Sequence, residues 1–282
     1  MATAQVNGVS LYYEINGEGP WLFQVPGAVS GHEGYGSVTP AMAKHYRVLD
    51  YDPRGYGSSD KPDQRYTFEV WADDMVGLLD ALDVEATHLH GGSMGSTLAL
   101  YFAARYPQRV RGLVLSGCAA KSDSMAVAQY EVWKSLARAY GTDSRELACE
   151  LASKAVSRDF FDGPDGGETL IDAIADLAGR FVSPKVFCDA CDALITVDVT
   201  GDLADVRAPT LIIAGGVDML TPPVQGPKGA GARFIFEGLT GVPFKEYVEL
   251  ARSAHGNLME HPDECIAAIV PFLRRVDATP SG

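Results

Sequence analysis

Positive charge is scarce in this sequence, and the shortage excludes a class of partners. The 282 residues include 23 Lys and Arg against 37 Asp and Glu, which gives a formal net charge of -14. Binding to a phosphate backbone requires clustered Lys and Arg, and no basic run occurs along the chain. The composition therefore excludes a nucleic-acid partner, and an anionic membrane surface for the same reason.

Long apolar runs are missing as well. No stretch approaches the roughly 18 residues that are needed to span a bilayer. The first residues, MATAQVNGVSLYYE, lack the basic segment and the apolar stretch of a secretory signal. We therefore expect a cytoplasmic protein with no membrane partner.

Cysteine is also sparse, with five residues in the whole chain. An odd number without a secretory signal argues against a disulfide framework, so we expect free thiols. Cys188 and Cys191 form a CxxC, but no second cysteine pair completes four ligands for zinc. The surrounding KVFCDACDALI is typical of a helix on which the two thiols share a packed face. We expect neither a metal nor a cofactor.

The residues that are present indicate one α/β domain with a substantial core, since 46% are hydrophobic and 21% charged. VNGVSLYYEING predicts an N-terminal hairpin. After it, apolar strand-like segments alternate with segments of helical period through residues 20–116. The expected strands are WLFQV, YRVLDY, THLHGG and VRGLVLSG, and the expected helices are FEVWADDMVGLLDAL and STLALYFAARY. This alternation predicts a parallel sheet with crossover helices.

A helical, acidic stretch interrupts the strand pattern from about Cys118 to Arg207. Strands resume at PTLIIAGG and near FKEYVEL, and PDECIAAIVPFLRRV predicts a final helix. We therefore predict a core made of residues 1–117 and 208–276, a helical lid over residues 118–207, and a disordered tail over residues 277–282.

The strongest local motif is the GxSxG formed by residues 91–95, GGSMG, between an expected strand and an expected helix. A serine on such a bent turn needs small neighbours, which glycine supplies, and its hydroxyl lies at a helix N-terminus. Free N–H groups there can stabilise developing negative charge. We predict that Ser93 is a nucleophile.

A serine hydroxyl needs an adjacent base, and the base needs an acid that orients it. Asp218 follows the strand-like run TLIIAGG, and His255 follows KEYVEL, in the order acid then histidine that this turn type favours. His261 is an alternative base, although its place before a proline suggests a helix start. Asp52 is an alternative acid. We interpret the alternating His88 and His90 as core residues of a strand rather than metal ligands; they are not part of the predicted site.

Three further segments extend the pattern: YRVLDYDPRGYGSSDKP, APTLIIAGGVDMLTPP and HGNLMEHP. Together with the serine turn, they make the chain similar to the α/β-hydrolase superfamily over nearly its whole length. The resemblance implies a mostly parallel eight-stranded sheet flanked by helices, with a helical lid and a Ser93–His255–Asp218 triad. The family's oxyanion hole would use the backbone N–H of Met94, which the turn itself supplies, and that of Ala28, by family position.

Two positions depart from the family pattern. The common His-Gly after the third strand is Pro26-Gly27 here, and the glycine that usually precedes the histidine is Ala254. Ser93 stands where haloalkane dehalogenases and soluble epoxide hydrolases have aspartate, which indicates acyl chemistry. GGSMGSTLAL resembles the elbow of proline iminopeptidases, whereas DPRGYGSSDKP resembles small esterases, enol-lactonases and ring-cleavage C–C hydrolases.

The stretch from Gly117 to Arg207 would form the roof of the pocket. It contains sixteen acidic and nine basic residues, a field from which an anionic substrate gains nothing. Its aromatic residues could line an apolar pocket, although most belong in a lid core: Tyr130, Trp133, Tyr140, Phe160, Phe161, Phe181 and Phe187.

We therefore expect a serine hydrolase whose small-molecule substrate is a neutral, largely apolar carboxylic ester or lactone, including an aromatic or macrocyclic lactone. A proline iminopeptidase-like aminopeptidase is the first alternative. A C–C hydrolase of ring-cleavage products, or a non-catalytic ligand-binding protein on the same scaffold, is the next. A homo-oligomer is left open.

Overall fold

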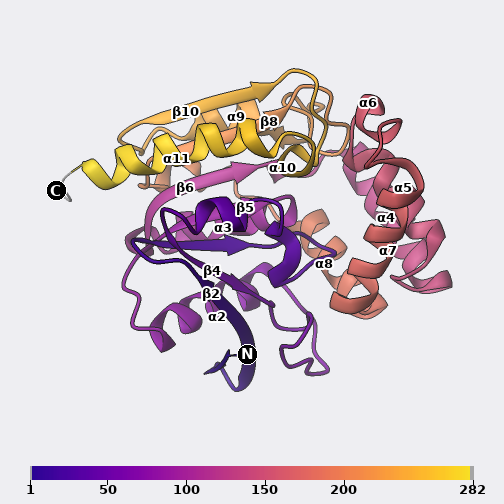
Figure 1. The fold of residues 1–282 in the computed structure, drawn as a ribbon, viewed down its shortest axis with the longest axis horizontal. Coiled ribbons are helices and arrows are strands. Elements are labelled where there is room, and N and C mark those ends of the chain that lie inside the picture. Colours follow the sequence, from indigo (N-terminus) through magenta and orange to yellow (C-terminus); the bar gives the residue numbers. More distant parts are fainter. Residues whose placement is uncertain (1, 280–282) are drawn as a thin grey trace.

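Eight strands form the main sheet of the computed structural model, which describes residues 2–279 (Figure 1). Their order across the sheet is β1-β2-β4-β3-β5-β6-β8-β10. Strand β2 is antiparallel to both of its neighbours, and every pairing from β4 to β10 is parallel. The strands are β1 (Ala2–Val6), β2 (Val9–Asn16), β3 (Trp21–Val25), β4 (Arg47–Tyr51), β5 (Thr87–Gly92), β6 (Val110–Ser116), β8 (Thr210–Gly215) and β10 (Lys245–Leu250). The predicted mostly parallel eight-stranded sheet is confirmed.

The N-terminal hairpin predicted from the sequence joins β1 to β2. Asn7 and Gly8 at its turn have φ angles of 47° and 79°. A two-residue turn of type I′ requires positive φ at both positions, and Asn-Gly is a preferred pair for it. The turn sets Val6 opposite Val9, and β2 pairs with β4 along its other edge.

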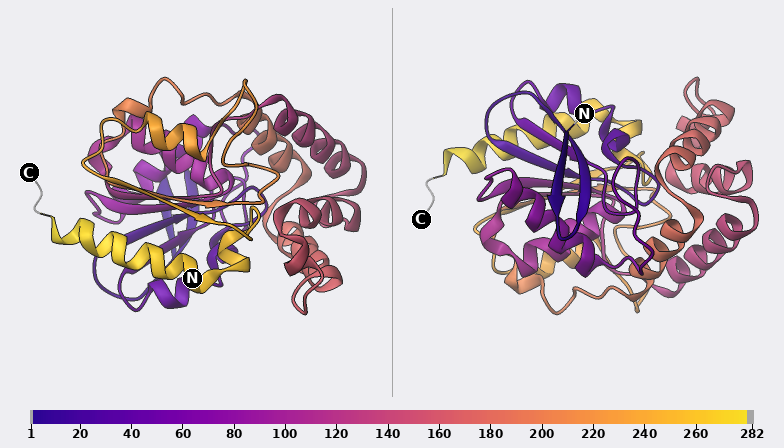
Figure 2. Two further views of the ribbon diagram at one scale, coloured as in Figure 1. Left: turned by 90° about the horizontal axis from the view of Figure 1, so that it is seen from above. Right: turned by 90° about the horizontal axis from the view of Figure 1, so that it is seen from below.

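Helices cover both faces of the sheet (Figure 2). Successive side chains of a strand point to opposite faces, so Leu22 and Phe23 belong to different cores. Helices α1 (Thr39–Met42) and α11 (Pro262–Ala278) pack on the face of Leu22; α2 (Phe68–Ala81), α3 (Met94–Arg105) and α9 (Ala232–Gly238) pack on the face of Phe23. The remaining short helices outside the lid are α10 (Asn257–Glu260), η1 (His32–Tyr35), η2 (Pro107–Arg109) and η3 (Leu203–Asp205).

Five helices lie together at one end of the molecule, next to the sheet rather than on its faces (Figure 1). They are α4 (Ser124–Tyr140), α5 (Arg145–Ala155), α6 (Arg158–Phe161), α7 (Gly167–Phe181) and α8 (Pro184–Thr196). Side chains cap four of their N-termini: Asp123, Ser144, Ser157 and Ser183 each accept a backbone N–H of the first turn. We call these five helices the lid. They occupy the stretch predicted to be helical, and the domain boundaries at residues 118 and 207 stay a prediction.

A small second sheet beside the lid was not predicted from the sequence. Strand β7 (Ala119–Lys121) pairs antiparallel with β9 (Ala230–Gly231), at the start of the segment where the strand pattern was expected to stop. Two and three residues are too few to give a strand-like alternation in the sequence.

The C-terminal helix is longer than expected. Helix α11 continues to Ala278, so the disordered tail predicted from residue 277 is wrong for its first two residues. Asp277 explains the extension, because its carboxylate lies 3.0 Å from both His88 Nε2 and Arg111 Nη2 on the sheet. Residues 280–282 of that predicted tail lie outside the described residues. Within residues 2–279, no helix is both long and apolar enough to cross a membrane.

Candidate active site

Ser93 is the N-cap of α3, directly after the last residue of β5. Its φ of 55° and ψ of -126° lie in a region that side chains rarely adopt. Such a conformation costs about 1–3 kcal/mol and persists only where the surroundings fix it. Here Ser93 N donates to Ser116 O at 2.9 Å, and Ser96 Oγ donates to Ser93 O at 2.6 Å. Both bonds hold the turn that exposes the hydroxyl.

The glycines of the GxSxG motif are required by close backbone contacts. A Cβ at Gly95 would lie 1.9 Å from Val25 O, and one at Gly91 would lie 2.3 Å from Gly95 O. Real Cβ atoms do not approach oxygen so closely, so any side chain would push α3 away from the ends of β3 and β5. The two glycines therefore set the position of Ser93 above the sheet.

His255 lies between Ser93 and Asp218. Its Nε2 is 2.8 Å from Ser93 Oγ, and its Nδ1 is 3.0 Å from Asp218 Oδ2. The Asp218 side chain is fully buried, and that of His255 is 10% exposed. The three predicted triad residues are thus in hydrogen-bond contact, each in a loop at the carboxyl end of a parallel strand: β5, β8 and β10. In the tautomer with its proton on Nδ1, His255 can accept the serine proton.

Thr221 also belongs to this network, although the sequence did not predict it. Its Oγ1 donates to Asp218 Oδ2 at 2.7 Å and is 3.1 Å from His255 Nδ1. The other oxygen of Asp218 accepts from the backbone N–H groups of Leu220 and Thr221, at 2.7 and 3.0 Å. Burial by itself raises the pKa of Asp218. The adjacent His255 and these hydrogen bonds outweigh burial and lower the pKa below its ordinary value. The carboxylate is therefore held in its charged form.

Glu260 connects the histidine loop to the lid. One of its carboxylate oxygens accepts from Ala254 N at 2.7 Å, and the other accepts from Ser157 N at 3.0 Å. Glu260 stands in the HGNLMEHP segment that resembles the family, but the sequence alone did not say what it binds. Ser157 belongs to the lid, at the start of α6. The carboxylate thus fixes the residue before His255 relative to a lid helix.

A small inner cavity of about 30 Å³ borders Ser93 and His255. Ala28 and Met94, the two residues predicted for the oxyanion hole, also line it. Met94 is the first residue of α3, so its N–H has no acceptor within the helix. Tyr56 holds the other loop, because its hydroxyl donates to Ala28 O at 3.2 Å. A Cβ added at Gly27 would be 3.5 Å from Ser93 Cβ, so the loop after β3 passes close to the nucleophile.

The roof of the inner cavity is apolar. Tyr130 and Trp133 of α4 and Leu194 of α8 line it from the lid, and Leu220 closes it from the loop after β8. Trp133 in turn packs on Phe187, with ring centroids 6.5 Å apart. Of the seven lid aromatics named from the sequence, Tyr130 and Trp133 line the inner cavity. The other five lie elsewhere: Phe181 and Phe187 are buried, Phe160 packs partly buried within the lid, Tyr140 is exposed, and Phe161 borders a separate outer cavity.

The alternative acid and base are not part of this network. Asp52 accepts from His32 N at 2.9 Å and from Ser58 N at 2.8 Å. His261 precedes α11 and pairs with Glu264 at 3.0 Å. Each therefore has partners of its own, away from Ser93.

The remaining histidines and thiols of interest are buried. His88 pairs with Asp277, and His90 Nε2 is 3.2 Å from Ser116 Oγ, while burial lowers the pKa of His90 to about 3. Cys188 and Cys191 are on α8, where burial raises the pKa of both thiols. No group of three or more His, Cys, Asp or Glu in residues 2–279 is arranged to hold a metal ion.

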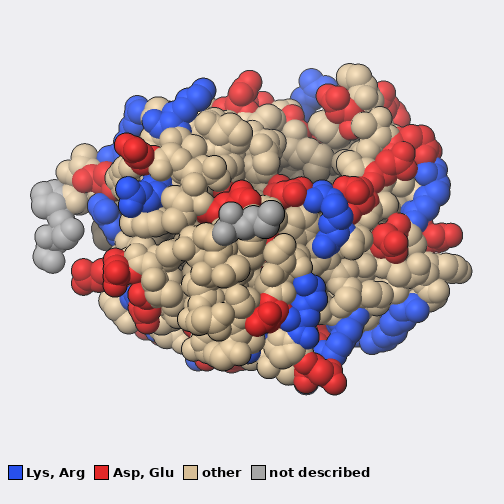
Figure 3. Space-filling view, turned by 60° about the horizontal axis from the view of Figure 1, so that its bottom comes forward, with Lys and Arg blue, Asp and Glu red and all other residues tan. Residues whose placement is uncertain are grey.

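Acidic and basic side chains are interspersed over the face of the molecule that Figure 3 shows.

Comparison with known proteins identifies the family. Residues 20–262 match the model of the alpha/beta hydrolase fold family. The chain is 28% identical over 276 residues to 3-oxoadipate enol-lactonase 1 of Acinetobacter baylyi, which covers 95% of each protein. It is 40% identical over 120 residues to 2-hydroxymuconate semialdehyde hydrolase of a Pseudomonas species, a match that covers 42% of this chain and 40% of that protein.

A solved structure gives the same result. The enol-lactonase from Burkholderia xenovorans LB400 superposes with a TM-score of 0.85 at 27% identity, covering 97% of this chain and 100% of that one. The predicted family and fold are therefore confirmed. This chain belongs to the alpha/beta hydrolase fold family and is a hydrolase.

Proposed function

We propose that this hydrolase cleaves a carboxylic ester or lactone through an acyl-enzyme on Ser93, and that the reacting end of the substrate is neutral and apolar. The observation that carries the proposal is the contact series Ser93 Oγ, His255 and Asp218, with separations of 2.8 and 3.0 Å. The apolar roof above Ser93 supports an apolar acyl group, since burying it there gains about 25 cal/mol per Å².

The first half of the reaction acylates the enzyme. Ser93 Oγ attacks the carbonyl carbon while His255 Nε2 takes its proton, and Asp218 stabilises the imidazolium that forms. The N–H groups of Met94 and Ala28 bind the oxyanion of the tetrahedral intermediate. The intermediate collapses by breaking the bond to the alcohol oxygen, which receives the proton from Nε2. In a lactone this alcohol stays attached to the acyl group.

The second half releases the acid. Water loses a proton to His255 Nε2 and attacks the acyl carbon, and the bond to Ser93 Oγ then breaks as the serine recovers its proton. The enol-lactonases among the relatives support this reaction class, because one matches 95% of the chain and another superposes on 97% of it.

The test uses 4-nitrophenyl butyrate with the wild type and Ser93→Ala. Loss of the nucleophile should lower kcat by a factor on the order of a million. Ser135→Ala is a matched control, because Ser135 is exposed on α4 and its hydroxyl donates to Glu131 O of its own helix. A fluorophosphonate should add its mass to the wild type and not to Ser93→Ala. Near-normal turnover by a well-folded Ser93→Ala variant would refute the mechanism.

A second candidate is hydrolysis of a C–C bond in a ring-cleavage product. The 40% identity to 2-hydroxymuconate semialdehyde hydrolase over 120 residues favours it. The same enzyme sample can be given 2-hydroxymuconate semialdehyde, whose disappearance is followed by absorbance. A kcat/KM for this compound above that for 4-nitrophenyl butyrate would make the C–C reaction the principal one.

A further inference from the structure

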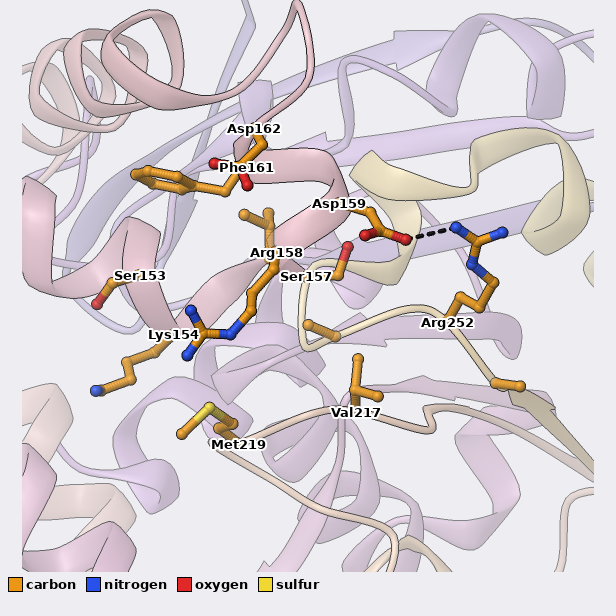
Figure 4. A pocket seen from close by; sticks show the side chains of 13 residues that line it. Ser153, Lys154, Ser157, Arg158, Asp159, Phe161, Asp162, Val217, Met219 and Arg252 are labelled. Carbon is orange, nitrogen blue, oxygen red and sulfur yellow. Dashed lines mark hydrogen bonds and ion pairs between the residues drawn. The ribbon is translucent and has the colours of Figure 1, made fainter.

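A large cavity is lined by Ala254, the neighbour of His255, but by none of the three triad residues; Figure 4 shows the side chains that line it. Its volume is about 640 Å³, within the range of about 300–1,000 Å³ that small-molecule sites have. Lid residues of α5 and α6 form one wall, and the loops after β8 and β10 form the other. We call it the outer cavity. The inner cavity at Ser93, of about 30 Å³, has room for no more than about two water molecules.

A third cavity, of about 110 Å³, borders residues of both. It shares Lys154 and Met219 with the outer cavity, and Tyr130 and Leu220 with the inner one. The three spaces are therefore neighbours, in a row from the outer cavity to Ser93. Ala254, the neighbour of His255, also borders the outer cavity.

Met219 stands at the boundary of the row, and its unbranched side chain can change rotamer at little cost. It is 67% exposed and lies between Asp218 and Leu220. Met219 and Leu220 are therefore the residues that an ester in the outer cavity would have to pass on its way to Ser93.

The charges of the outer cavity differ from those of the lid as a whole. Three cations and two carboxylates line it, in a chain whose net charge is -14. Arg252 is neutralised by Asp159 at 2.5 Å. Lys154 and Arg158 have no carboxylate partner within residues 2–279. In Figure 4 both extend toward the Met219 side of the cavity, whereas Asp162 lies on the opposite side.

We propose that the outer cavity is the access chamber of the enzyme and an anion subsite, in which Lys154 and Arg158 bind a carboxylate at the far end of the substrate. The inference rests on the proposed function, and it makes the substrate class a carboxylate-bearing ester or lactone with an apolar reacting end. Two adjacent cations without counter-ions attract an anion, and a carboxylate completes their hydrogen bonds. The acidic excess of the lid by itself disfavours anions. A substrate in the outer cavity meets Lys154 and Arg158 instead.

The test compares mono-4-nitrophenyl suberate, which carries a free carboxylate, with methyl 4-nitrophenyl suberate, which is neutral and nearly isosteric. The adipate pair repeats the comparison with a shorter chain. The measured quantity is the ratio of kcat/KM for the acid to kcat/KM for its methyl ester. The variants are Lys154→Gln with Arg158→Gln, and Lys154→Glu with Arg158→Glu. Arg145→Glu is the matched control, because Arg145 is on the same helix α5 but pairs with Glu168 outside the cavity.

The wild type should prefer the acid for at least one chain length, and the ratio should fall about tenfold in the double Gln variant, further in the double Glu variant, and not in Arg145→Glu. Raising the salt concentration should lower the wild-type ratio, because it screens the two cations. A ratio that both double variants leave unchanged would overturn the anion subsite. Failure of the wild type to hydrolyse either ester would instead overturn the proposed function.

Discussion

The carboxylate of Asp218 accepts from Leu220 N, from Thr221 N and Oγ1, and from His255 Nδ1. An amide at this position could keep most of the geometry, but it would present N–H to one of these donors and favour the wrong tautomer of His255. Asp218→Asn should therefore lower kcat by about 10⁴, as loss of the triad acid does in other serine hydrolases. Steady-state kinetics on 4-nitrophenyl butyrate measures it.

Asp52→Asn is the matched comparison, since Asp52 is as deeply buried and bonds to His32 and Ser58. Its effect on kcat should stay below about tenfold, because the triad does not include it. If Asp52→Asn were the more damaging of the two at equal stability, the acid would have to be reassigned.

His90 gives the protein a predictable weakness in acid. Burial lowers its pKa from 6.5 to about 3, so the folded chain keeps it neutral while the unfolded chain binds a proton below about pH 6.5. Stability therefore falls as the pH drops from about 6.5 toward 3, and at pH 5 this one group should cost about 2 kcal/mol of unfolding free energy relative to pH 8. Urea unfolding at both pH values measures the loss.

His90→Gln removes the titrating ring, so its own stability difference between pH 8 and pH 5 should be smaller by about 2 kcal/mol. The same substitution at exposed His45 serves as control and should leave the wild-type difference in place. Equal pH dependence in the wild type and His90→Gln would contradict this assignment of the acid sensitivity.

At the scale of single residues, the sequence predicts the groups with fixed chemistry and misses their supports. The GxSxG turn predicts that Ser93 is the nucleophile, and the positions of Asp218 and His255 after strands predict the acid and the base. Thr221 and Glu260 carry no such signal, because a threonine or glutamate near a loop end has many possible partners. Their contacts arise from folded loops, and in the case of Glu260 from a lid residue 103 positions away.

Among the elements, α3 depends most tightly on one residue. A Cβ at Gly95 would lie 1.9 Å from Val25 O on the neighbouring strand β3. Gly95→Ala should therefore destabilise the fold by about 3 kcal/mol and displace Ser93 as the helix shifts. The urea midpoint and kcat should fall together.

Gly201→Ala is the control for Gly95→Ala. Gly201 lies outside α3, and a Cβ added there would have no described atom within 4 Å. It should change the unfolding free energy by less than about 0.5 kcal/mol. A Gly95→Ala variant as stable and active as Gly201→Ala would show that α3 can move without consequence.

Strands of five or more residues and helices of three or more turns were predicted from their patterns. The parallel strands are apolar runs separated by helices of ordinary length, and the limits of α2, α3, α8 and α11 are within about two residues of those predicted. Elements of two to four residues, such as β7, β9, α1 and α10, were missed because one turn or one ladder pair has no period. The end of α11 was placed two residues early because the ion pairs of Asp277 are made to distant strands.

On the scale of the whole molecule, the sequence predicts the number of charges but not their location. The acidic excess of the lid left open an aminopeptidase that holds a substrate ammonium with carboxylates. In the structure, none of the residues that line the inner cavity is acidic, and Asp218 lies behind His255 as its partner. An ammonium placed near Ser93 would have no counter-charge. The fold was predictable because strands and helices alternate along the chain and the triad residues follow strands in the order Ser, Asp, His. The distribution of charge around the cavities was not, because it depends on which side of each lid helix faces the core.

Discrimination between esters and prolyl amides follows from that distribution. Burying an unpaired ammonium in an apolar cavity costs several kcal/mol, whereas an acyl chain gains free energy in proportion to its buried area. The kcat/KM for 4-nitrophenyl butyrate should therefore exceed that for L-prolyl-4-nitroanilide by at least about a hundredfold, or about 2.7 kcal/mol in transition-state binding. The intrinsic reactivities of an ester and an anilide differ, so butyryl-4-nitroanilide is measured as well and compared with L-prolyl-4-nitroanilide. The prolyl anilide should be the poorer of the two anilides, since it carries the ammonium and both share the leaving group. A faster rate on the prolyl anilide would require a carboxylate at the cavity that the structure places elsewhere, and the aminopeptidase would then replace the esterase.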